Sequence, residues 1–129
     1  MNREIKFRGK SLKTGKWLYG DLIHNRGKVY IAPIGEIYYG SEEASDFEVD
    51  EGTIGQFIGI KDKNDIEIYE GDIVRYGGEI CIIYYDKCSC MFTYKDKDGN
   101  YFILFSGADN PPLEFEVLGN IYDDPELLK

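Results

Sequence analysis

The stretch from Thr53 to Tyr76, TIGQFIGIKDKNDIEIYEGDIVRY, decides the fold. Two apolar runs, Ile54 to Ile60 and Ile66 to Tyr69, flank the polar segment Asp62 to Asp65. A second polar turn follows at Glu70 to Asp72. Short runs rich in β-branched and aromatic residues, separated by Gly, Asp and Asn, are typical of β-hairpins. The stretch therefore predicts consecutive short strands joined by tight turns.

Short strands are expected along the rest of the chain as well. Alternation from Glu4 to Arg8 predicts an opening strand in which Ile5 and Phe7 face a core while Arg8 faces water. The pair Asp98 and Gly99 predicts a hairpin turn, because glycine accepts positive φ at little cost. Further strands are predicted at Trp17–Ile23, Lys28–Ala32, Glu79–Tyr85, Met91–Tyr94, Tyr101–Phe105 and Glu114–Val117.

Helical signals are limited to two short pieces. Ser41 can cap one helical turn over Glu42 to Ala44, and Asp124 precedes Pro125 at the start of a second. No apolar stripe with a 3.6-residue period is sustained anywhere. We therefore expect a mainly β fold of small SH3-like, partly open barrel units, with one or two short helical pieces.

An internal similarity bears on domain organisation. At a shift of 51 residues, Gly20 and Asp21 fall on Gly71 and Asp72, and Gly27 falls on Gly78. The similarity has two readings, the recurrence of hairpin signals or two related β units. The chain length fits a single domain over residues 1–129, with 1–50 and 51–122 as candidate sub-units and 123–129 as a short tail.

Composition and charge restrict the classes of partner. The chain is 43% hydrophobic, and its formal net charge is −9. A negative field repels phosphate backbones and so disfavours nucleic acid. The chain contains no apolar run of about 18 residues and no signal-peptide pattern at its start, so we expect no membrane partner and a cytoplasmic location.

No residue set with the spacing of a catalytic, cofactor or metal site is found. Cys81, Cys88 and Cys90 are expected to be reduced thiols, and their spacing with His24 does not match a zinc site. The segments 62–65 and 96–100 lack the ligand pattern of a calcium loop and are predicted to be turns, in which Asp and Asn side chains bond to nearby backbone N–H groups. The nearby acids Glu67, Glu70 and Asp72 lie on a strand and a turn, which does not favour a rigid acid pair. We therefore expect a non-enzymatic protein.

Three readings of what the protein binds remain. The N-terminal quarter is locally basic beside aromatic residues, a pattern that binds nucleic acid in small β barrels. Its candidate residues are Lys6, Arg8, Lys10, Lys13, Lys16 and Trp17. An acidic protein can also mimic DNA and inhibit a host protein, although the acids here are scattered. The many tyrosines favour a third reading, contact with an unidentified protein partner or with further copies of the chain.

The central motif GQF.G.KDKN..EIYEGDIV resembles the signature of the YopX-like proteins of phages and prophages. The opening REIKFRGKSLKTGKWLYGDLI and the ending FEVLGNIYDDPELL also resemble that family, and Gly9 departs from it. The resemblance implies an accessory protein of a phage or prophage in a bacterial host, with a small β-rich fold and no catalytic residues to carry over. The signature residues that we expect to be structural are Gly55, Gly59, Asp62, Asn64, Tyr69, Gly71 and Asp72.

Overall fold

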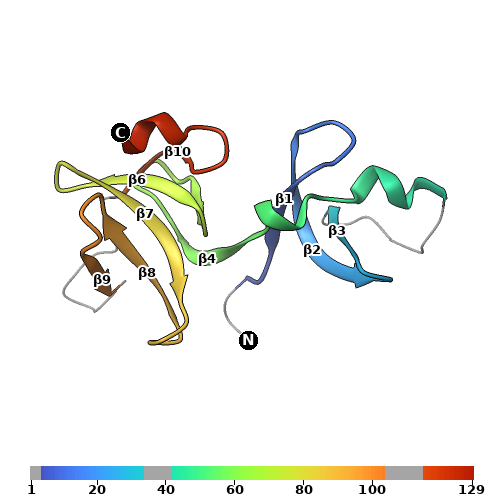
Figure 1. Cartoon of the computed structure of the whole chain (residues 1–129), viewed down its shortest axis with the longest axis horizontal. Helices are drawn as coiled ribbons and strands as arrows, with labels where there is room; N and C mark the ends of the chain where they lie inside the picture. The colour runs from blue at the N-terminus through green and yellow to red at the C-terminus, as the bar shows by residue number, and fades with distance from the viewer. Residues whose placement is uncertain (1–3, 34–41, 104–114) are drawn as a thin grey trace. The chain divides into compact units, whose positions relative to one another are not determined.

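The computed structural model describes residues 4–33, 42–103 and 115–129 (Figure 1). The chain divides into two compact units, residues 1–57 and 58–129. In the described ranges, ten strands form two five-stranded antiparallel sheets, in the orders β3-β2-β1-β4-β5 and β10-β6-β7-β8-β9. Neither sheet closes into a barrel, and the helical pieces in the described ranges are short 3-10 helices. The prediction of a mainly β fold is confirmed.

The first unit is built on an antiparallel meander. The hairpin of β2 and β3 pairs Asn25 with Lys28, and β1 pairs with β2 through Arg8 and Tyr19. The elements of this unit are β1 (Phe7–Lys10), β2 (Trp17–Asn25), β3 (Lys28–Pro33), η1 (Glu42–Phe47), η2 (Glu51–Thr53) and the start of β4 (Gly55–Lys61).

The core of the first unit forms around Val49. This residue is buried with Val29 and Ile31, and its backbone N–H donates to the Val29 carbonyl at 3.0 Å. An isolated bridge also joins Val49 to Ser11. Each fully buried aliphatic side chain of this kind stabilises the folded state by about 1.5–3 kcal/mol. Partly buried side chains pack around the three, namely Phe7, Leu18, Leu22 and Ile54.

The N-terminal alternation predicts two side-chain positions that the structure corrects. Arg8 was expected to face water but is 5% exposed, whereas Ile5 was expected in a core and is 40% exposed. The reason is that β1 begins only at Phe7, after Ile5. In addition, the neighbouring strand supplies the indole of Trp17, whose ring centre lies 4.6 Å from the Arg8 guanidinium.

The second unit packs its sheet against β5. Its buried cluster consists of Ile68, Val74, Cys81, Ile83 and Phe115, so side chains from β5, β6 and β7 share one core. Its elements after β4 are β5 (Glu67–Tyr69), β6 (Asp72–Tyr76), β7 (Glu79–Asp86), β8 (Met91–Asp96), β9 (Tyr101–Ile103), β10 (Glu116–Asn120) and η3 (Pro125–Leu128).

The internal similarity corresponds to two hairpins with the same tip. The β2–β3 tip has φ values of 53° at Arg26 and 77° at Gly27. The β6–β7 tip, 51 residues later, has 58° at Gly77 and 82° at Gly78. Two successive positive φ values define the turn type that best fits the twist of a two-residue hairpin. The correspondence is therefore one of backbone geometry, which either reading of the similarity allows.

Several predicted boundaries differ from the observed ones. The last strand is β10, which starts two residues later than predicted, and Glu114 lies outside the described residues. Strand β9 is described to Ile103, and Ser41 also lies outside the described ranges. At the C-terminus η3 starts with Pro125 as predicted, but Asp124 does not cap it through its side chain. Its carboxylate instead accepts a hydrogen bond from the backbone N–H of Asn120 at 3.2 Å.

Candidate functional site

The signature residue Asp62 holds two distant parts of the second unit together. Its Oδ1 accepts hydrogen bonds from the backbone N–H groups of Asn64 at 2.8 Å and Ile66 at 2.9 Å. Its Oδ2 accepts a third bond, from the backbone N–H of Val117 at 2.9 Å. The side chain thus shapes the turn between β4 and β5 and also fixes that turn to β10. It is 6% exposed, which is unusual for a carboxylate in a turn.

The environment of Asp62 favours its ionised form. Burial raises the pKa of this carboxyl, but the three backbone hydrogen bonds and the charge of Lys63 outweigh burial, so the pKa lies below the usual aspartate value. Hydrogen bonds to a charged form stabilise that form, which explains the direction. Both oxygens of the carboxylate thus accept backbone hydrogen bonds that hold the turn.

The second signature turn is held in the same way. Asp72 is 2% exposed, and its Oδ2 accepts a hydrogen bond from the backbone N–H of Tyr69 at 2.8 Å. Gly71 has φ of 89°; its N–H donates to the carbonyl of Ile83 at 2.8 Å, and its carbonyl accepts from Ile121 at 2.9 Å. This turn therefore joins the start of β6 to β7 and to the segment after β10.

The remaining signature residues lie on β4 and in its turn. Gly55 is buried at the start of β4, whereas Gly59 is exposed and has φ of 98°. The space around Gly59 is open, so its backbone conformation, and not close packing, is the reason for glycine there. Asn64 is exposed and contributes its backbone N–H to Asp62. In the acid group near this turn, Glu67 accepts a hydrogen bond from the Tyr69 hydroxyl at 3.2 Å.

The basic N-terminal residues fall into two groups. In the strand group, Arg8 and Lys10 both lie against Trp17, with Lys10 Nζ 5.6 Å from the ring centre. Lys6 pairs with Glu4 at 2.9 Å and also lies 5.3 Å from the ring of Phe57. Cation–π contacts of this kind hold the basic groups on the protein's own aromatic rings.

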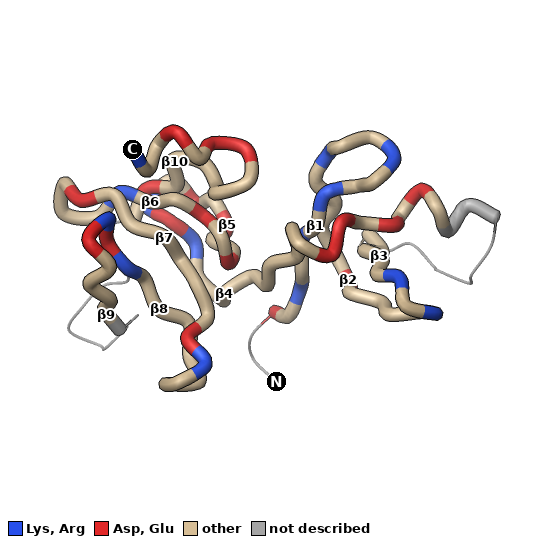
Figure 2. The backbone as a smooth tube through the Cα atoms, in the orientation of Figure 1, with Lys and Arg blue, Asp and Glu red and all other residues tan. Residues whose placement is uncertain are grey.

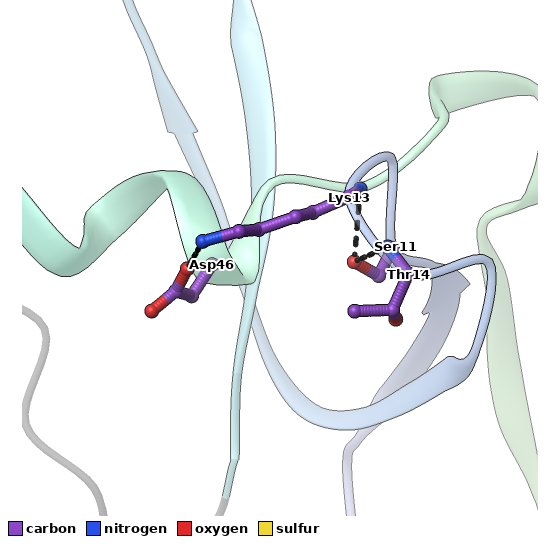
Figure 3. Close-up of polar contacts among 4 residues, drawn as sticks. All are labelled: Ser11, Lys13, Thr14 and Asp46. Carbon is purple, nitrogen blue, oxygen red and sulfur yellow. Dashed lines mark hydrogen bonds and ion pairs between the residues drawn. The ribbon is translucent and has the colours of Figure 1, made fainter.

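The loop group lies between β1 and β2 (Figure 3). Ser11 Oγ accepts hydrogen bonds from the backbone N–H groups of Lys13 at 3.2 Å and Thr14 at 3.1 Å, which closes the loop. The ammonium group of Lys13 extends to the carboxylate of Asp46 and pairs with it. Lys16 is exposed at the end of the loop. The structure therefore places Lys10 beside Trp17 and places Lys13 and Lys16 in an adjoining turn.

Cys81, the pair Cys88 and Cys90, and His24 lie on three different elements. Cys81 is 2% exposed in the core of the second unit, whereas His24 lies on β2 in the first. Cys88 and Cys90 are exposed in the β7–β8 loop. Burial, followed by the nearby charges of Asp96 and Glu79, raises the pKa of the Cys81 thiol. Among the described residues, no three His, Cys, Asp or Glu side chains form a group that could hold a metal ion.

Sequence reasoning missed an exposed apolar edge on the second sheet. We define the aromatic edge as Tyr85, Met91, Tyr101 and Phe102, on β7, β8 and β9. Their exposed fractions run from 38% for Met91 to 68% for Tyr101. Tyrosine-rich strands were visible in the sequence, but which rings stay uncovered depends on strand order, and among the described strands β9 is the last of its sheet.

Side chains of the aromatic edge project on both faces of the sheet. Phe102 is paired in register with Tyr94, and their rings stack with centres 5.2 Å apart. Tyr101 is adjacent to Phe102 on the same strand, so its side chain faces the opposite side of the sheet. Two residues from Tyr94 along β8, and therefore on the same face, the ring of Phe92 meets that of Tyr85 edge to face, with centres 5.5 Å apart. An extended segment lying along β9 would therefore contact apolar side chains on both faces.

Charge is distributed unequally between the units. Residues 58–129 contain 15 acidic and 7 basic residues, which gives a formal charge of −8. Residues 1–57 contain 9 acidic and 8 basic residues, which gives a formal charge of −1. Figure 2 shows the basic positions along β1 and the loop after it, and acidic positions in the turns of the second unit. Within the described ranges, no helix has the length and hydropathy needed to cross a bilayer.

Comparisons with known proteins agree with this fold. A search of curated proteins found no match. A crystal structure of protein EF1440 from Enterococcus faecalis is similar, with a TM-score of 0.62 and 22% sequence identity over 99% of this chain and 100% of that one. At this identity the likeness concerns the fold alone. The model of the YopX protein family matches residues 6–129. The chain therefore belongs to the YopX family, as its central motif predicted.

Proposed function

We propose that this protein is a non-enzymatic accessory protein of a phage or prophage that acts by binding another protein through the aromatic edge. The observation that supports the proposal is the exposure of Tyr101 and Phe102 on β9, the outermost strand at one side of the sheet, together with that of Met91 on β8 and Tyr85 on β7. Contiguous exposed apolar side chains mark interaction sites on folded proteins. Tyrosine suits such sites because its ring is apolar and its hydroxyl can bond at a wet rim.

The mode of binding that fits the edge is the addition of a strand. In the described part of the chain, β9 pairs with β8 on one side only. The backbone of an edge strand offers N–H and C=O groups to an extended segment, and alternate side chains give specificity. The aromatic side chains on both faces of β9 would flank such a segment.

Charge supports a basic partner over a second copy of the chain. A formal charge of −8 in the second unit attracts a cationic segment and repels an identical unit. Lysine and arginine side chains of the partner can also stack on the exposed tyrosine rings. We therefore propose an extended basic segment of a host or phage protein as the partner.

Photo-crosslinking from the edge tests this function. A photoreactive amino acid replaces Tyr101 in one variant and Tyr19 in a matched control, since Tyr19 is also an exposed strand tyrosine but lies in the first unit. We expect a defined protein, identified by mass spectrometry from host cells, to be crosslinked at position 101 and not at 19. Phe102→Ser should abolish that product.

Two results would contradict the proposal. If light scattering shows a dimer that Phe102→Ser dissociates, the edge serves self-association and not a second protein. If position 101 captures nothing beyond what position 19 captures, the aromatic edge is not a binding site. Far-UV circular dichroism of each variant confirms that the fold is retained.

A second candidate function is nucleic-acid binding by the first unit. The observation in its favour is that Arg8 and Lys10 gather against Trp17 in a unit whose net charge is only −1. Against it, Arg8 is buried and Lys13 is paired with Asp46. We expect no electrophoretic shift with single-stranded DNA at micromolar protein and low salt. A shift that weakens with salt, and falls when Lys10, Lys13 and Lys16 become Gln, would favour this function instead.

A further inference from the structure

The loop between β7 and β8 carries two exposed thiols on a constrained backbone. Asp86 and Met91 form the last pair of the hairpin, so residues 87–90 make the connection. The Asp86 carboxylate accepts hydrogen bonds from the backbone N–H of Cys88 at 3.2 Å and from the Ser89 hydroxyl at 2.7 Å. These bonds fix the first half of the loop to the end of β7.

The second half of the loop folds back on the first. Cys90 has φ of 56°, an uncommon conformation for a residue with a side chain. Its thiol lies 3.5 Å from the carbonyl oxygen of Lys87, the oxygen of the peptide unit that joins Lys87 to Cys88. The thiol of Cys90 thus points back to the peptide unit that precedes Cys88, and both cysteines are exposed.

We infer that Cys88 and Cys90 form a two-coordinate site for a thiophilic monovalent cation of the Cu(I) type. Soft thiolate ligands select Cu(I) over harder ions. Structural zinc needs four ligands, and the described residues offer no group of three. The buried thiol of Cys81 belongs to the core of the unit and takes no part. Binding converts two thiols into thiolates and releases two protons, with no change of oxidation state.

The dithiol form, and not a disulfide, is the state that binds. Residues two apart are joined by a short backbone segment, and a disulfide between them departs from relaxed geometry. Strained disulfides are readily reduced, so in a reducing compartment the two thiols persist. A cation bridging the sulfurs imposes no S–S bond length and is compatible with the loop.

Cu(I) titration of the full chain tests this site, independently of the proposed protein partner. Under anaerobic conditions, a chromogenic Cu(I) chelator competes with the wild type and with the single variants Cys88→Ser, Cys90→Ser and Cys81→Ser. We expect one equivalent bound, with an ultraviolet thiolate-to-metal band. Loss of either loop thiol should weaken binding at least about 100-fold, because the second ligand then acts without a high effective concentration. Cys81→Ser should bind as the wild type does.

Three outcomes would overturn the inference. Equal affinity in wild type and in either loop variant would mean that the thiols act singly. A loss in Cys81→Ser equal to that in the loop variants, with circular dichroism unchanged, would place the site elsewhere. A mass loss of two hydrogens in glutathione buffer at reducing poise, absent in Cys88→Ser, would show an intraloop disulfide in place of a cation site.

Discussion

Two turns of the second unit share one backbone design but differ in what they hold. In the turns that start at Asp62 and Asp96, Oδ1 of the aspartate accepts the backbone N–H groups two and four residues later, at 2.8–3.0 Å. In both turns the residue three positions after the aspartate has positive φ, 67° at Asp65 and 85° at Gly99. The difference lies in the second oxygen. Oδ2 of Asp62 accepts a hydrogen bond from the backbone N–H of Val117. Oδ2 of Asp96 instead accepts one from the side-chain amide of Asn100, at 3.2 Å.

The comparison shows how a local motif becomes a tertiary contact. An aspartate that accepts nearby backbone N–H groups suffices to form a turn. One further bond, to a residue 55 positions away, buries the Asp62 carboxylate and joins β4 and β5 to β10. The Asp96 turn closes only its own hairpin, between β8 and β9.

The largest effect is expected from removing each aspartate. Asp62→Ala leaves three backbone N–H groups without their acceptor and should lower the free energy of unfolding by about 3 kcal/mol. Asp96→Ala should cost clearly less, because water can replace the exposed carboxylate. Amide hydrogen exchange measures the difference directly, since Val117 N–H should lose protection in Asp62→Ala alone. Equal losses in the two variants would mean that the bond to Val117 adds nothing.

A smaller effect is expected from protonation. The folded pKa of Asp62 is lowered, so its contribution to stability is present above the ordinary aspartate pKa of about 4 and is lost as the pH falls through the folded pKa. Asp62→Asn keeps an acceptor for the two local bonds but turns an amide NH₂ toward Val117. It should cost about 1–2 kcal/mol at pH 7.

The measurement is the urea midpoint of unfolding at pH 7, 4 and 3. We expect the acid loss of stability to be smaller in Asp62→Asn than in the wild type. The pKa of Asp96 is lowered too: burial raises it, and the hydrogen bonds from Asn100, Asp98 and Gly99 outweigh burial. Asp96→Asn is therefore the matched control, and it should change the acid dependence less because its site is open to solvent. Parallel pH curves for wild type and Asp62→Asn would refute the linkage.

The smallest effects are expected from substitutions at the two positions with positive φ, Asp65 and Gly99. Gly99→Ala should cost about 1 kcal/mol, because the added methyl group meets no neighbour and only the backbone conformation opposes it. Asp65→Gly should gain about 0.5 kcal/mol by relieving the same conformation. Thermal unfolding followed by circular dichroism measures both. A loss in Asp65→Gly would show that the ion pair of Asp65 with Lys61, at 3.6 Å, outweighs the strain.

Local chemistry made the turns predictable. Gly, Asp and Asn between apolar runs identified the turns at 62–65 and 98–99 and the tips near Gly27 and Gly78, and the structure contains turns at each. The central motif identified the family. These signals are readable because turn conformation is set by the residues of the turn itself.

Positions that depend on distant segments were not predictable. The alternation of apolar and charged residues predicted that Arg8 is exposed, but the indole of Trp17 on a neighbouring strand covers it. Hydropathy gives no sign that Asp62 is buried, because its third bond partner is Val117. The aromatic edge was missed for the same reason, since strand order, and not strand sequence, decides which rings remain uncovered.

The position of the single tryptophan gives the two units separate optical signals. Trp17 lies in the first unit beside Arg8 and Lys10, so unfolding of that unit removes two cations from its ring and alters the indole emission. The second unit contains no tryptophan and absorbs through its tyrosines. Fluorescence excited at the red edge of indole absorption therefore follows residues 1–57 alone, while tyrosine bands in near-ultraviolet dichroism are weighted toward residues 58–129. Transitions that coincide in both signals would mean that the two units unfold as one.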